Sequence, residues 1–164
     1  NTGLVNVAIA KQMLYTESRQ VQSRGFNFNT EIDYPIYPDI TGKLILPPNT
    51  LQADITDDYS FKYDVTLRGQ TVYDKVNHTA VFTEMVKFDL IVFLTFEELP
   101  QTARDYIAIC AARKFQRRIL GSQTIDGITK AEEISAKVTL ENADSNQADY
   151  NMVDSTFTQL MLAR

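Results

Sequence analysis

Residues 86–120 decide the fold, and they read VKFDLIVFLTFEELPQTARDYIAICAARKFQRRIL. The first part, Val86 to Phe96, is long and mostly apolar, as expected of a largely buried strand. The second part, Glu97 to Leu120, has helical periodicity with one apolar face: Leu99, Ala103, Tyr106, Ile107, Cys110, Ala111 and Phe115. The segment therefore predicts a strand that is followed directly by a long helix.

Both ends of this predicted helix carry typical charges. Glu97 and Glu98 stand at its start, where the helix dipole favours negative charge, and Pro100 suits a first turn. A basic cluster, which comprises Arg113, Lys114, Arg117 and Arg118, occupies the last turns before Gly121. Two further helices are predicted. Residues 2–23 form the first, which Gly25 ends, and residues 130–146 form the other, with capping-box spacing between Thr129 and Glu132.

Between the first and second of these helices, residues 26–96 contain short runs of β-branched and aromatic residues separated by Pro and Gly, a pattern typical of short strands. Alternating apolar and polar residues over 61–67 predict a half-buried strand, and 43–46, 71–74 and 79–82 predict three more. Strands that are segregated from helices indicate an α+β fold class. We expect a helical bundle from residues 1–25 and 97–149, an inserted small antiparallel β domain at 26–96, and a C-terminal tail at 150–164.

The composition and charge of the chain argue against some classes of function. The 164 residues carry a formal net charge of −5, and 44% of them are hydrophobic, as in an ordinary globular protein. The sequence pI of about 4.9 argues against tight nucleic-acid binding, which usually needs a basic surface. No apolar run is long enough to span a membrane, and no signal peptide is visible at the first residues.

The sequence offers little for catalysis, and we expect no cofactor and no bound metal. His78 and Cys110 are single residues, predicted to be a solvated turn residue and a packed core residue, so they form no zinc motif. No phosphate-binding loop or nucleophile elbow is present. Paired carboxylates among Asp54, Asp57, Asp58, Glu97 and Glu98 leave one enzymatic alternative, a polysaccharide-degrading hydrolase. An enzyme is nevertheless not the expected function.

Several short strings, in their order and spacing, resemble one protein family along nearly the whole chain. They are residues 22–29 (QSRGFNFN), 71–74 (TVYD), 99–100 (LP), 112–118 (ARKFQRR), 150–154 (YNMVD) and the terminal 162–164 (LAR). Together they resemble the tail tubular protein A family of short-tailed phages (podoviruses), which are tail adaptors or connectors.

The resemblance implies a structural protein of the virion tail, assembled in the host cytoplasm. It implies a helical bundle with an inserted β domain, and a homo-oligomeric, dodecameric ring that joins the portal protein to the nozzle protein (tail tubular protein B). Tail fibres would attach outside. DNA would pass through the lumen of the ring during ejection, without specific binding.

Two groups of residues are candidates for contacts in such a ring. The first is the basic cluster Arg113, Lys114, Arg117 and Arg118, for which the alternative is a solvated helix end. The second is the apolar tail, with Tyr150, Met152, Phe157, Leu160 and Met161. Aromatic residues and Met are enriched in the cores of interfaces, but these side chains could equally cover the core of their own domain.

Overall fold

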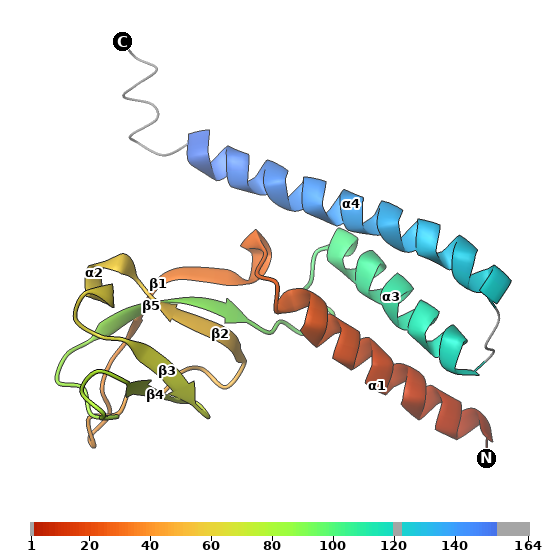
Figure 1. Ribbon diagram of the computed structural model, residues 1–164. Coiled ribbons are helices and arrows are strands. Elements are labelled where there is room, and N and C mark those ends of the chain that lie inside the picture. The colour runs from red at the N-terminus through yellow and green to blue at the C-terminus, as the bar shows by residue number, and fades with distance from the viewer. Residues whose placement is uncertain (1, 120–122, 154–164) are drawn as a thin grey trace, which may run out of the picture. The chain divides into compact units, whose positions relative to one another are not determined.

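The computed structural model describes residues 2–119 and 123–153. The chain divides into two compact units, which Figure 1 shows in a rainbow from red to blue. The helical unit draws on Asn1–Val21 and Thr95–Arg164, and the β unit is Gln22–Leu94. Helices and small antiparallel sheets occur together, so the predicted mixed α+β class is confirmed.

The β unit is built on a three-stranded antiparallel sheet in the order β1-β5-β2, from Thr30–Ile36, Val86–Val92 and Thr50–Ile55. Strands β3 (Val65–Arg68) and β4 (Thr71–Asp74) form a separate two-stranded sheet. The short 3-10 helix η1 is Asn27–Asn29, and the single-turn helix α2 is Asp57–Ser60. This unit therefore consists of short elements, and β5 is the central strand of its larger sheet.

Strand β5 supplies much of the core of the β unit. Its residues Val86, Phe88, Leu90 and Val92 are buried and alternate with more exposed ones. Phe88 lies opposite Tyr34 of β1 and Ile55 of β2. Buried residues from the remaining strands and loops complete the cluster: Ile36, Leu44, Leu46, Val72 and Phe82.

A network of buried polar groups joins the two ends of the β unit. The side chain of Gln22 bonds both backbone groups of Leu94: its Nε2 donates to the carbonyl at 3.0 Å and its Oε1 accepts from the N–H at 2.8 Å. Asn29 Nδ2 donates to the carbonyls of Gln22 and Val92, and its Oδ1 accepts from the N–H of Phe26. The network therefore links the first residues of the β unit, 22–29, to its last residues, 92–94.

Strand β1 is an edge strand with an irregular backbone. The register with β5 shifts between Glu31 and Tyr34, and Asp33 has a φ of 57°. Its N–H donates to Asp89 Oδ1 at 3.0 Å. Pro35, further along the strand, has no N–H to offer to another chain.

Several strand predictions were wrong in extent. Residues 43–46 and 79–82 contribute only isolated bridges, and the predicted strand 61–67 begins at Val65, because Lys62 and Tyr63 bond back to Tyr59 after α2. Strand β5 ends at Val92, not at Phe96. Strands β1 and β2 were not predicted.

The helical unit contains α1 (Thr2–Gln22), α3 (Gln101–Ile119) and α4 (Gln123–Val153). Helix α3 packs along α4, while α1 approaches α3 less closely. The predicted apolar face of α3 is buried at Ala103, Tyr106, Ile107, Cys110 and Ala111, and α4 contributes Leu140. Among the residues that the structure describes, no helix is both long and apolar enough to cross a membrane.

Two helix boundaries differ from their predictions. Helix α3 begins at Gln101 and not at Glu97, because residues 95–98 form a turn in which Glu98 bonds Thr95. Helix α4 begins at Gln123, so Thr129 lies inside it and does not cap it. It also continues to Val153, beyond the predicted start of the tail at residue 150, since no Pro interrupts this stretch. Gly25, by contrast, follows the end of α1 with a φ of 74°, as predicted.

Candidate functional site

The structure divides the predicted basic cluster into two pairs. Arg113 Nη1 lies 2.8 Å from Glu133 Oε2 of α4, and only 16% of the Arg113 side chain is exposed. Lys114 Nζ lies 2.5 Å from Glu17 Oε1 of α1 and 3.3 Å from Gln20 Oε1. These two cations therefore connect α3 with α4 and with α1 inside the helical unit.

Arg117 and Arg118 are both exposed at the C-terminal end of α3. Cations at this end complement the negative pole of the helix dipole. Their exposure also makes them accessible to an acidic surface of another molecule. Lys114 is exposed as well, with half of its side chain accessible, so three of the four cations of the predicted basic cluster lie at the surface.

Glu17 is a buried acid that the sequence analysis did not single out. Its side chain is only 7% exposed, and Lys114 is its partner. A buried carboxylate is tolerated when a cation and hydrogen bonds compensate its lost hydration. An acid next to Leu14 and Val21 on the inner face of an amphipathic helix is the signal that could have found it.

The predicted tail residues lie outside what the structure describes. Tyr150 and Met152 fall within the bounds of α4, but their side chains are not among the described ones. Phe157, Leu160 and Met161 also lie outside the described residues. The contribution of the tail to an interface stays a prediction.

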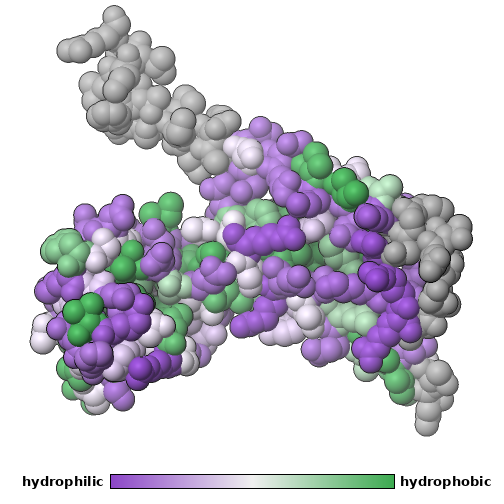
Figure 2. Space-filling model, in the orientation of Figure 1, coloured by the Kyte–Doolittle hydropathy of each residue, from purple (hydrophilic) through white to green (hydrophobic). Residues whose placement is uncertain are grey.

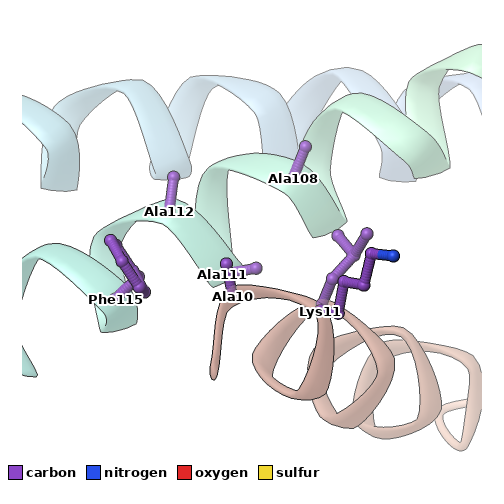
Figure 3. A pocket seen from close by; sticks show the side chains of 7 residues that line it. Ala10, Lys11, Ala108, Ala111, Ala112 and Phe115 are labelled. Carbon is purple, nitrogen blue, oxygen red and sulfur yellow. The ribbon is translucent and has the colours of Figure 1, made fainter. Parts of the chain in front are cut away.

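An apolar groove separates α1 from α3. It encloses about 370 Å³ and is lined by Ala10, Lys11, Leu14, Ala108, Ala111, Ala112 and Phe115, which we call the α1–α3 groove. Figure 3 shows Ala10 and Ala111 between the two helices, with Phe115 at one end. Four of the seven lining side chains are methyl groups, too short to fill the space. The groove could not be predicted from the sequence, because alanines in an amphipathic helix are typical of its packed face.

The carboxylates considered for hydrolysis are divided between the two units. Asp54, Asp57 and Asp58 belong to the β unit, and Glu97 and Glu98 to the helical unit. The backbone N–H and the hydroxyl of Thr95 both donate to Glu98 Oε2 and lower the pKa of this carboxyl. A glycosidase acid needs the opposite, a pKa that is raised so that the group stays protonated.

Other carboxyl groups with a shifted pKa in the described residues follow the same direction. Hydrogen bonds from Thr41 and Lys43 lower the pKa of Asp39, and hydrogen bonds from Lys62 and Tyr63 lower that of Glu84. Burial alone would raise the pKa of Asp74, but its hydrogen bonds with Asn77 and Val76 lower it. The carboxyl groups of these acids accept hydrogen bonds that order turns and loops of the β unit.

His78 and Cys110 do not form a site. His78 is an exposed turn residue of the β unit, with a φ of 52°. Cys110 is buried in the helical unit, where burial raises the pKa of its thiol. No group of three or more metal-ligating side chains occurs within residues 2–119 and 123–153.

The Thr95–Glu98 turn makes stability depend on pH. Because the pKa of Glu98 is lower in the folded chain, its contribution is present above the unfolded glutamate pKa of about 4.3 and is lost as pH falls through the folded value. We therefore expect Glu98→Gln to lower the melting temperature at pH 7 and to differ less from the wild type near pH 3. Thermal unfolding by circular dichroism checks this. Glu97→Gln is the matched control, and an equal pH profile for both variants would contradict the prediction.

Comparisons with known proteins agree with one another. A family model described as "Tail tubular protein" matches residues 1–150. Tail tubular protein A of Klebsiella phage KP34 is 30% identical to the chain over 108 residues, which are 66% of this chain and 56% of that relative. The chain thus spans just over half the length of this curated relative. Since the family match covers nearly all of its residues, the chain belongs to the tail tubular protein family, whose members are structural components of phage tails.

Proposed function

We propose that this chain is a ring-forming adaptor that joins the portal to the tail nozzle and lines the channel through which DNA leaves. The observation that carries the proposal is the family match over residues 1–150. The charge of the chain is compatible with it, because a net charge of −5 disfavours adhesion of passing phosphates. The mechanism is geometric: contacts between different surfaces of identical subunits close into a ring when the rotation closes.

The partners in this proposal are further copies of the chain in a dodecameric ring, the portal protein, the nozzle protein and the tail fibre. Because the chain spans only part of its curated relative, the nozzle and fibre contacts are proposed for the assembled tail and are assigned to no particular residues. Within the chain, the exposed pair Arg117 and Arg118 and the residues 150–164 are proposed to contribute to inter-subunit or portal contacts.

Charge reversal of the exposed pair tests the basic part of this proposal. We expect Arg117→Glu with Arg118→Glu to reduce the amount of ring bound to the portal protein by at least about tenfold, since each reversed charge makes an attraction repulsive. Native mass spectrometry of the chain mixed with its portal protein measures the assembled mass. Lys43→Glu with Lys75→Glu is the matched control, because it changes the net charge equally in the β unit.

Truncation after Asp149 tests the tail in the same assay. Unchanged ring mass and portal binding would remove residues 150–164 from the proposal. If the unmodified chain forms no ring on the portal protein, the adaptor function itself is wrong. The hydrolase alternative has no observation in its favour among the described residues, and cleavage of a capsular polysaccharide that stops on neutralising one acid would restore it.

A further inference from the structure

The α1–α3 groove is an apolar surface of the helical unit that side chains of the described residues leave open. Its walls are the methyl groups of Ala10, Ala108, Ala111 and Ala112, together with Leu14 and Phe115. Lys11 is its one charged lining residue. A concave apolar surface of this kind, between two helices, fits an apolar ridge of a further helix.

The same unit carries such a ridge on α4. Ile134 and Val138 are four residues apart, so they lie on one side of the helix, and we call them the α4 ridge. They are 55% and 49% exposed, although both side chains are large and apolar. Figure 2 shows hydrophobic atoms interrupting the otherwise hydrophilic surface of α4.

The helices that carry the two surfaces have net charges of opposite sign. Outside the internal ion pairs Arg113–Glu133 and Lys114–Glu17, the described parts of α1 and α3 have an excess of four positive charges, since Asp105 stands against Lys11, Arg19, Arg104, Arg117 and Arg118. Without the paired Glu133, residues 130–147 of α4 have an excess of one negative charge, since Lys130 and Lys137 stand against Glu132, Glu141 and Asp144. Opposite potentials steer two surfaces together and fix their orientation.

We infer that the α1–α3 groove of one subunit receives the α4 ridge of a second copy of the chain. The inference rests on the proposed ring function and specifies which surfaces meet. Groove and ridge are different surfaces, so the contact is heterologous, and each subunit keeps one groove and one ridge for its two neighbours. A second copy fits better than an unrelated partner because every copy offers both the apolar shape and the complementary charge.

Cross-linking between two distinguishable chains tests the contact directly. One chain carries Ala112→Cys and the other, lengthened by a tag, carries Val138→Cys, both in a Cys110→Ala background because Cys110 is the only natural cysteine. The two are mixed, assembled on the portal protein and treated with a short bismaleimide. We expect a cross-linked heterodimer, and none from the control mixture of Gln12→Cys with Val138→Cys, since Gln12 does not line the groove.

The outcomes separate this inference from the function on which it rests. Rings that form without the heterodimer, or with equal cross-linking of the control, overturn the inference and leave the adaptor proposal intact. Absence of rings from the unmodified chain overturns both. A heterodimer of Ala112→Cys with Met161→Cys in place of Val138→Cys would assign the groove to the tail and also overturn the inference.

A charge variant of the α4 ridge provides a second test. Ile134→Asp with Val138→Asp places two carboxylates in the proposed apolar contact, and we expect at least about a tenfold loss of ring assembly while the helical circular dichroism is kept. Ser135→Asp with Thr139→Asp adds the same charges at the same spacing on another exposed side of α4, and should assemble normally. Equal assembly by both variants would contradict the contact.

Discussion

Replacing Phe88 with alanine is expected to lower the free energy of unfolding of the β unit by about 3–5 kcal/mol. Phe88 is fully buried at the centre of β5, between Tyr34 and Ile55 on the neighbouring strands. Truncation removes the apolar contacts of the ring and leaves a cavity that a small unit of short strands can only partly close. Urea unfolding followed by tyrosine fluorescence measures the loss, because the chain has eight tyrosines and no tryptophan.

Phe61→Ala is the matched control for this variant. Phe61 is 85% exposed, so its truncation should change the stability by less than about 0.5 kcal/mol. A loss of similar size in the two variants would mean that Phe88 does not lie in the core of the folded chain in solution.

Replacing Gln22 with alanine is expected to cost about 2–4 kcal/mol, although only a polar side chain is lost. Gln22 is fully buried, and its amide bonds both the N–H and the carbonyl of Leu94. Alanine would leave both backbone groups without these partners in a part-buried place, where unpaired polar groups are costly. Urea unfolding measures the effect, and Gln12→Ala, at an exposed position of the same helix, should be nearly neutral.

A Gln22→Glu variant distinguishes the hydrogen bonds from the volume of the side chain. A carboxylate can still accept from the N–H of Leu94, but it cannot donate to the carbonyl of Leu94. We therefore expect the variant to be destabilised at pH 7 and to recover part of the loss near pH 4, where a protonated carboxyl can donate again. Full stability of Gln22→Glu at pH 7 would contradict the role assigned to this network.

The sequence predicted the elements whose periodicity is strong. The buried alternation of β5 and the apolar face of α3 follow patterns that packing enforces, because each has one side in the core. Strand β1 was missed since its middle residues, from Glu31 to Pro35, are all exposed and so have no alternation to detect. Its pairing with β5 comes from residues fifty or more positions away, which local patterns do not contain.

The candidate surfaces were only partly predictable for a related reason. The basic residues of α3 could be recognised, but their partners could not: Glu133 lies 20 residues from Arg113, and Glu17 lies 97 residues from Lys114. The string at residues 22–29, which carried part of the family resemblance, includes the buried amides of Gln22 and Asn29. Its role in this structure is to hold the ends of the β unit together.

The irregular backbone of β1 affects how readily strands of other molecules can pair with this edge of the sheet. An unpaired sheet edge is a template on which strands of other molecules can add without limit. In this chain the left-handed residue Asp33 distorts that edge, and Pro35 removes a donor from it. The β1 edge is thus a poor template for amyloid-like stacking of copies gathered at high local concentration.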